Sequence, residues 1–182
     1  MYLYCLNKKT ETVKIIIDMN HVWLLLGANL GNELQLFSQA IAAIESQIGV
    51  CVAQSYVYTS PPWGFSHANK FYNQALEVKT ELSAESVLQA CLSIEHDLGR
   101  TRKFNSGYQA RIIDIDIVYY NSSIIDLEYL HIPHSLMHTR KFTLVPLSDI
   151  APEYMHPILH KTTLQLLAEC VDDATVTRLE GE

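Results

Sequence analysis

The sequence predicts an α+β fold, and three observations support that prediction. Three runs rich in β-branched and aromatic residues, at 22–26, 50–58 and 71–78, have the composition of strands. The segments 32–49 and 83–99 carry apolar residues at helical spacing. An isoleucine-rich run follows the second helix, so the order is strand, helix, strand, strand, helix, strand. That order is the ferredoxin-like βαββαβ core, which we expect here with long central loops and a C-terminal extension.

Each predicted helix has residues that mark its start and its end. Asn32 and Ser83 can cap the two helices, because their side chains accept hydrogen bonds from N–H groups of the first turn. Gly49 closes the first helix, and Leu98-Gly99 closes the second. The two loops between regular elements are about 11 residues long, a length that is often functional. These loops are residues 59–69 and 100–110.

Beyond the core the pattern changes to shorter pieces. Asn121-Ser122 is a turn signal, and the segment to Ile132 is expected as another short strand or a pair of strands. Short helical pieces follow Pro133, and residues 162–170 predict a last helix.

Length and composition predict a single globular domain, and the scattered cysteines with no signal-peptide pattern lead us to expect a cytoplasmic protein. The chain has 182 residues, 48% of them apolar and 18% charged, which is ordinary for a globular protein. We expect residues 1–20 to be an N-terminal extension of uncertain status and residues 21–182 to form one domain. A net charge of −7 argues against a nucleic-acid partner, whose binding depends on Lys and Arg. No apolar run reaches the roughly 20 residues of a membrane helix, so we expect no membrane partner, and we expect a monomer.

Several common site types have no signal in this sequence. The four cysteines are scattered without a CxxC pair, and we interpret them as reduced packing residues. The eight histidines form no HExxH pattern, which makes a zinc site improbable. A GxxxxGK[ST] motif is absent, and the glycine pair at 27–31 is too sparse for a phosphate-binding loop. It is better interpreted as a tight turn beside a ligand.

Two carboxylates, Asp114 and Asp116, lie two residues apart inside the isoleucine-rich run. Side chains alternate along a strand, so both carboxylates would project from one face, with Ile113, Ile115 and Ile117 on the other. Carboxylate oxygens suit Mg²⁺, which fills its remaining positions with phosphate oxygens and water. The alternative is a structural ion pair with a neighbouring arginine, since like charges on one strand are costly unless they are compensated.

A basic cluster precedes these aspartates. Arg100, Arg102 and Lys103 follow the second helix, and Arg111 lies three residues before Asp114. Basic residues at a helix C-terminus complement the helix dipole and need no ligand, which explains one or two of them. Guanidinium groups also bind phosphate oxygens in pairs. Acids that can hold Mg²⁺ beside such arginines suggest phosphoryl transfer.

Aromatic residues offer a weaker signal for a planar ligand. Trp63, Phe71 and Phe142, with Asn73 at a polar edge, could form a flat slot, although aromatic residues at such positions are more often core. On composition alone, His134 is a surface or hydrogen-bonded histidine.

Four stretches occur in a fixed order: LGANLG at 26–31, YTSPPWG at 58–64, the segment 94–117 containing IE, GRTR and RIIDIDI, and the segment 132–147 containing IPH, RKF and PL. Together they resemble the 6-hydroxymethyl-7,8-dihydropterin pyrophosphokinase family of folate biosynthesis. The resemblance covers about residues 22–157. Each stretch is modest evidence alone, whereas all four in this order are highly specific.

The resemblance implies an enzyme that moves the β,γ-pyrophosphoryl unit of ATP to the hydroxymethyl oxygen of 6-hydroxymethyl-7,8-dihydropterin and releases AMP. It implies that Asp114 and Asp116 hold two Mg²⁺ ions with the ATP, and that Arg100 and Arg111 are catalytic and steady the moving phosphates. The implied ATP-binding residues are Glu95, Arg102, Tyr108, Ile117, His134 and Arg140. The implied pterin-binding residues are Ser60, Pro62, Trp63, Phe71, Asn73 and Phe142.

The chain departs from the family pattern at four places. Tyr108-Gln109-Ala110 stands where the family usually has Trp-Gly-Pro, and Leu92 stands where a glutamine is common. Ser135 stands where Pro or Tyr is usual, and Ala28 stands where serine is usual. These changes bear on loop closure and ATP affinity, and the metal and arginine set is intact. Two alternative hypotheses are a non-catalytic ferredoxin-like module that binds a small molecule, and a different nucleotide-dependent transferase on the same scaffold.

Overall fold

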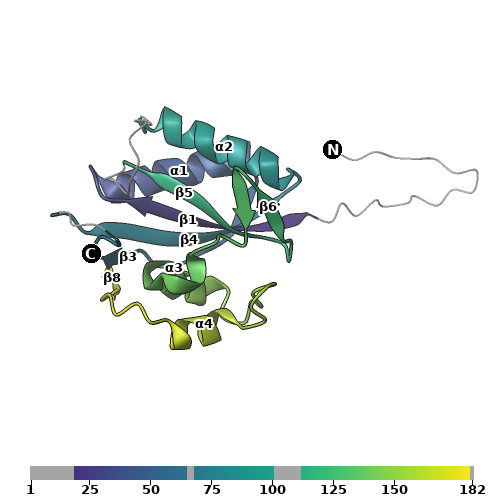
Figure 1. Cartoon of the computed structure of the whole chain (residues 1–182). Coiled ribbons are helices and arrows are strands. Elements are labelled where there is room, and N and C mark those ends of the chain that lie inside the picture. Colours follow the sequence, from purple (N-terminus) through teal and green to yellow (C-terminus); the bar gives the residue numbers. More distant parts are fainter. Residues whose placement is uncertain (1–18, 65–67, 101–111, 181–182) are drawn as a thin grey trace, which may run out of the picture.

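The computed structural model describes residues 19–64, 68–100 and 112–180 and places one main sheet between two layers of helices (Figure 1). The strands are β1 (Asn20–Ala28), β2 (Val50–Gln54), β3 (Tyr58–Ser60), β4 (Phe71–Thr80), β5 (Asp114–Tyr120), β6 (Ile125–Leu127), β7 (Leu130–Ile132) and β8 (Thr177–Arg178). The helices are α1 (Glu33–Gln47), α2 (Ala84–Asp97), the 3-10 helix η1 (Met137–Thr139), α3 (Lys141–Ile150) and α4 (Thr163–Glu169).

The main sheet confirms the ferredoxin-like prediction. Its strand order is β5-β1-β4-β3-β8, with β2 also pairing with β4, and every pair is antiparallel. The predicted order of strand, helix, strand, strand, helix, strand therefore forms a sheet with β1 and β4 at its centre. β6 and β7 form a separate hairpin, which is the predicted pair of short strands.

The predicted capping residues start the helices. Asn32 Oδ1 accepts a hydrogen bond from Gln35 N at 3.3 Å at the start of α1, and Ser83 Oγ accepts one from Ser86 N at 3.3 Å at the start of α2. The last helix, α4, begins with a reciprocal capping box made by Thr162 and Gln165. These local signals fix where α1, α2 and α4 begin.

Alternation along the strands divides the interior into two cores. On one face of the sheet, Leu24 and Leu26 of β1 pack against α1 and α2. On the opposite face, Trp23 and Leu25 pack against α3 and α4. Successive side chains of β1 thus serve both layers, as the two-residue period of a strand requires. The sheet is buried on both faces.

The segment 50–58, predicted as one strand, is two strands, so that prediction was wrong. Gln54 pairs with Leu76 and Tyr58 with Asn73, which leaves one extra residue on the β2–β3 side. The Ser55 hydroxyl accepts a hydrogen bond from Ala75 N at 2.9 Å, and Tyr56 N donates to Asp149 of α3 at 3.2 Å. These side-chain contacts satisfy backbone groups that a continuous ladder would have used, and so they permit the break.

Other differences are small. β1 continues through Gly27 and Ala28, where a turn was expected, and the two-residue β8 had no signal in the sequence. Cys51, Cys91 and Cys170 are free thiols, as expected, and Cys5 lies outside the described residues. No helix in the described part of the chain combines the length and hydrophobicity that crossing a bilayer requires. The proposed extension at 1–20 lies almost entirely outside the described residues and stays a prediction.

Candidate active site

The two aspartates lie at the start of β5, where the chain enters the sheet. Ile113, Ile115 and Ile117 are buried in the core beneath α1 and α2, whereas Asp114 and Asp116 are only partly buried. The predicted alternation is therefore present, and both carboxylates belong to the face opposite those isoleucines. Asp116 pairs across the sheet with Leu25, which belongs to the second core.

Arg100 reaches the first of these aspartates from the end of α2. Gly99 has a φ of +96°, its N–H donates to His96 O, and Arg100 N donates to Glu95 O, both at 2.9 Å. This is a Schellman ending, which needs a residue that adopts a left-handed conformation and turns the chain back over the helix. Gly99 therefore explains why Arg100 returns to the last turn of α2 instead of leaving it.

Three charged side chains meet at this point. Arg100 Nη1 lies 2.5 Å from Asp114 Oδ1 and 2.5 Å from Glu95 Oε2. Glu95 is only 2% exposed, and its Oε1 accepts a hydrogen bond from Ile115 N at 2.8 Å. The structural ion pair considered as an alternative is therefore present between Arg100 and Asp114, and Glu95 joins it to the backbone of β5.

The electrostatics of this cluster follow from burial and from its mixed charges. Burial, followed by repulsion from Asp114, raises the pKa of Glu95 to about 7, against the opposing effects of the Ile115 N–H and Arg100. Burial by itself would lower the pKa of Arg100, but Asp114 and Glu95 outweigh it and raise that pKa. Arg100 therefore stays charged between two carboxyl groups.

A glycine lies between the acidic cluster and the candidate pterin residues. Gly27 of β1 pairs with Asp114 on one side and with Asn73 of β4 on the other. A Cβ on Gly27 would lie 3.7 Å from Asn73 Oδ1 and 3.9 Å from the Asp114 Cβ. The sequence pattern predicted a tight turn here. In the structure Gly27 is instead a strand residue without a side chain, and it leaves open the space between the Asn73 and Asp114 side chains.

The candidate pterin residues on β3 and β4 come together as expected. Asn73 and Ser60 are each 2% exposed, and Asn73 Nδ2 donates to Ser60 Oγ at 3.1 Å. Phe71 pairs with Ser60 in the sheet, and Pro62 and Trp63 follow β3 directly. A buried amide held by a hydroxyl is a polar edge of fixed orientation, which a heterocycle with donors and acceptors can use.

Arg140 joins the candidate ATP residues to the candidate pterin residues. Its side chain is nearly buried, with Cζ 4.7 Å from the centroid of the Trp63 ring and 5.7 Å from that of the Phe142 ring. A guanidinium near two aromatic rings gains cation–π attraction, which holds the rings in place. Trp63 and Phe142 thus both lie beside the Arg140 guanidinium, although they are far apart in the sequence.

His134 and Ile117 have different relations to the site. Burial, followed by repulsion from Arg140, lowers the pKa of His134 to about 4, so its ring is neutral at pH 7. The His134 Nδ1 accepts a hydrogen bond from Leu136 N at 3.3 Å. The Ile117 side chain is buried in the core, so a nucleotide could contact this residue only through its main chain.

Three candidate residues fall outside the described part of the chain: Arg102, Tyr108 and Arg111. Their assignments as ATP-binding or catalytic residues stay predictions.

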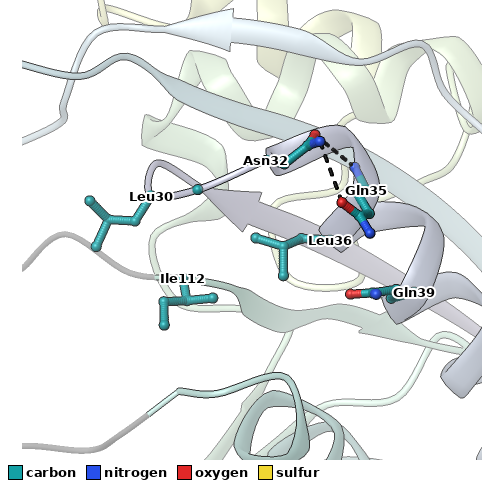
Figure 2. A pocket seen from close by; sticks show the side chains of 7 residues that line it. Leu30, Asn32, Gln35, Leu36, Gln39 and Ile112 are labelled. Atoms are coloured by element: carbon teal, nitrogen blue, oxygen red, sulfur yellow. Dashed lines mark hydrogen bonds between the residues drawn. The ribbon is translucent and has the colours of Figure 1, made fainter.

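A separate pocket opens at the start of α1 (Figure 2). It has a volume of about 530 Å³ and is lined by Leu30, Gly31, Asn32, Gln35, Leu36, Gln39 and Ile112. Figure 2 shows the two hydrogen bonds between Asn32 and Gln35, one of them the helix cap and the other between the two side-chain amides. None of the predicted site residues lines it, but Leu30 and Gly31 belong to the stretch at 27–31 that was predicted to be a turn beside a ligand. The pocket adjoins the segment that leads into β5 but does not contain the aspartates.

The donor set at the start of β5 fits a divalent cation. Asp114 and Asp116 supply hard oxygens that are partly exposed. Within residues 19–64, 68–100 and 112–180, no three His, Cys, Asp or Glu side chains form a cluster that could bind a metal. Two carboxylates with further positions taken by phosphate and water is the usual arrangement for Mg²⁺.

Comparison with known proteins places this arrangement in one family. Residues 23–152 match the family described as 7,8-dihydro-6-hydroxymethylpterin-pyrophosphokinase. The chain is 36% identical over 163 residues to the 2-amino-4-hydroxy-6-hydroxymethyldihydropteridine pyrophosphokinase of Methylorubrum extorquens, covering 89% of this chain and 100% of the relative. It is 44% identical over 146 residues to Folic acid synthesis protein FOL1 of Dictyostelium discoideum, covering 79% of this chain and 22% of the relative. The chain thus spans about a fifth of that larger protein.

A solved structure has the same fold. The wild-type HPPK-DHPS of Plasmodium falciparum with pteroate matches 83% of this chain and 44% of that protein, with a TM-score of 0.69 and 19% sequence identity. At this identity the likeness supports the ferredoxin-like architecture alone.

Proposed function

This chain belongs to the 7,8-dihydro-6-hydroxymethylpterin-pyrophosphokinase family, and we propose that it transfers pyrophosphate from ATP to the hydroxymethyl group of 6-hydroxymethyl-7,8-dihydropterin. It is an enzyme of folate biosynthesis and releases AMP. The hydroxymethyl oxygen forms a bond to the β-phosphorus of ATP and loses its proton to solvent. The bond from that phosphorus to the α,β-bridging oxygen breaks, and AMP keeps this oxygen.

One observation carries the proposal at the level of residues. The start of β5 places Asp114 beside Arg100, with Gly27 and then Asn73 next to it across the sheet. The proposed metal-binding residue Asp114, with Arg100 of the α2 end against it, and the proposed pterin-binding residue Asn73 would therefore be neighbours across β1. Reactions of this kind depend mainly on alignment and charge neutralisation, because the protein contributes little covalent chemistry.

The pterin would lie at the Asn73 end of the site. Asn73, held by Ser60, would read the polar edge of the ring, and Phe71 and Phe142 would stack on its faces. Pro62 and Trp63 would form the wall. The position of Arg140 against Trp63 and Phe142 supports this arrangement, since it holds that wall in place.

ATP would lie at the Asp114 end. Arg100 and Arg111 would steady the transferred phosphates, with Arg102, Tyr108, His134 and Arg140 binding the nucleotide and Ile117 contributing its main chain. The neutral His134 ring and the charged Arg100 are suited to polar and anionic groups respectively. Asp114 and Asp116 would hold two Mg²⁺ ions, which neutralise phosphate charge when they are bound.

The chain is further proposed to act as a cytoplasmic monomer. The candidate site is built from one copy of the chain, which supports the monomer.

The test is a product assay with purified protein, ATP, Mg²⁺ and 6-hydroxymethyl-7,8-dihydropterin. We expect AMP and the pterin diphosphate in equal amounts, both dependent on each substrate. ADP as the only nucleotide product would indicate an ordinary kinase. No nucleotide product would favour a non-catalytic module, in which the Arg100–Asp114 pair is purely structural.

A further inference from the structure

We propose that Glu95 is a positioning residue, which keeps Arg100 at the site when a divalent cation occupies Asp114. This inference rests on the proposed function, because it assigns Asp114 to a metal and Arg100 to phosphate. It differs from the nucleotide contact that the family resemblance implies for Glu95.

The burial of Glu95 argues against direct contact with a nucleotide. The residue is 2% exposed, and both carboxylate oxygens already have partners. Oε1 accepts from Ile115 N at 2.8 Å, and Oε2 lies 2.5 Å from Arg100. A nucleotide would have to displace one of these contacts and enter the core to reach it. The polar groups of a buried carboxylate are costly to leave unpaired.

The hydrogen bond from Ile115 N connects Glu95 to β5, the strand that carries Asp114 and Asp116. Ile115 lies between Asp114 and Asp116, so its N–H is the backbone donor between the two carboxylate-bearing residues. Glu95 therefore links the end of α2 to the part of β5 that must present both carboxylates. The Arg100 backbone is fixed to the same residue, since Arg100 N donates to Glu95 O at 2.9 Å.

Arg100 is shared between two carboxylates, and only one of them is accessible. Asp114 is 18% exposed in its side chain and Glu95 is 3% exposed. A cation that takes Asp114 competes with Arg100 for the same oxygen, but it does not compete for Glu95. Arg100 can then turn toward a phosphate while one guanidinium nitrogen stays on Glu95, because a guanidinium has several donors in fixed directions.

The substitution Glu95→Gln separates the two contacts. Glutamine keeps an oxygen that can accept from Ile115 N, but it removes the charge that faces Arg100. Arg100 would then depend on Asp114 alone and compete harder against a cation. The matched control is Glu85→Gln, which removes an exposed carboxylate from the first turn of the same helix.

The experiment is a double-mutant cycle read by metal binding without substrates. Mn²⁺ is titrated near pH 8 into wild type, Glu95→Gln, Arg100→Ala and the double variant, and free Mn²⁺ is counted by electron paramagnetic resonance. We expect Glu95→Gln to weaken Mn²⁺ binding about fivefold when Arg100 is present, and less than about twofold when it is absent, since the two residues are coupled. We expect Arg100→Ala alone to strengthen binding and Glu85→Gln to leave it unchanged.

Two outcomes would overturn the proposal. Equal weakening by Glu95→Gln in both backgrounds would mean that Glu95 acts on the metal directly. No weakening in the presence of Arg100 would mean that Glu95 does not hold it. Thermal unfolding of each variant checks that the fold is retained. Because the titration contains no substrate, it gives a result even if the product assay finds no AMP.

Steady-state kinetics supply the second readout. A positioning role predicts that Glu95→Gln lowers kcat about tenfold or more while the KM for the pterin changes less than about twofold. A parallel loss in pterin affinity would indicate general damage to the site instead of a misplaced Arg100 side chain.

Discussion

At the scale of single residues, the proposed chemistry depends on how Asp114, Glu95 and Arg100 are paired. The aspartates and the arginines could be named, because their types and spacing limit what they can do. Glu95 could not be placed, since nothing in the sequence shows that an acid in the last turn of α2 bonds to Ile115 N. That contact depends on how α2 packs on β5, which is a property of the folded chain.

Removing the second aspartate tests the metal assignment. We expect Asp116→Ala to lower turnover about a thousandfold or more, because a group that neutralises phosphate charge is lost. The free energy of unfolding should change by less than about 1 kcal/mol, since Asp116 is only partly buried on its strand. AMP formation and urea unfolding are the two measurements. Residual activity above about a tenth of wild type would remove the two-metal assignment.

Adding a side chain at Gly27 tests whether ligand lies over this position. We expect Gly27→Val to weaken pterin binding about tenfold or more, because the new atoms would occupy space between Asn73 and Asp114. The unfolding free energy should change by no more than about 1 kcal/mol, since valine suits a strand and the Cβ meets ordinary contact distances. Calorimetric titration measures the affinity, and Gly27→Ala provides the smaller step. Unchanged affinity in the valine variant would place the pterin elsewhere.

At the scale of elements, the strands and helices of the core were predictable where local signals agreed. Asn32, Ser83 and Gly99 act at the helix ends as their residue types suggest. The break between β2 and β3 was not predictable, because Asp149, which bonds Tyr56 N, lies 93 residues away. β8 was missed for a similar reason, since two residues gain strand geometry only through pairing with β3.

The loop before α4 contains a pH-sensitive contact. His156 is 4% exposed, and its Nδ1 accepts hydrogen bonds from Ile158 N and Leu159 N, both at 3.2 Å. Burial, followed by repulsion from the neighbouring His138, lowers the pKa of His156 to about 4. Because its folded pKa lies below the ordinary value of about 6.5, the stabilisation is present above pH 6.5 and is lost as the pH falls toward 4.

We therefore expect wild type to lose about 1–2 kcal/mol of unfolding free energy between pH 8 and pH 5 through this residue. His156→Asn should lack that loss, because the amide oxygen can accept the same hydrogen bonds but does not titrate. The measurement is the difference between the two proteins in urea unfolding across this pH range. His96→Asn, at an exposed site, should keep the wild-type slope. Identical slopes for wild type and His156→Asn would contradict the assignment.

At the scale of the whole molecule, both cores are built on one sheet. β1 supplies Leu24 and Leu26 to the side of α1 and α2, and Trp23 and Leu25 to the side of α3 and α4. Neither layer can be removed without exposing one face of the same strands. The C-terminal extension predicted from the sequence is thus part of the folding unit.

Cavity-forming substitutions in the two layers test this point. We expect Ile44→Ala in α1 and Leu144→Ala in α3 each to cost about 2–5 kcal/mol, since both side chains are fully buried. In both variants, far-ultraviolet circular dichroism and tryptophan fluorescence should follow one urea transition. Separate midpoints for the two probes would show that the layers unfold independently.

The cross-strand row of Asp114, Gly27 and Asn73 has a consequence for substrate geometry. Neighbouring strands lie about 4.8 Å apart, so two such steps separate the Cα atoms of Asp114 and Asn73 by roughly 10 Å. Hydrogen bonds of the peptide backbone set that Cα–Cα spacing, whereas the separation of the carboxylate and the amide also depends on the two side-chain conformations. Sequence variation in the surrounding loops can therefore alter how tightly the two reactants are held, while the backbone spacing beneath them stays constant.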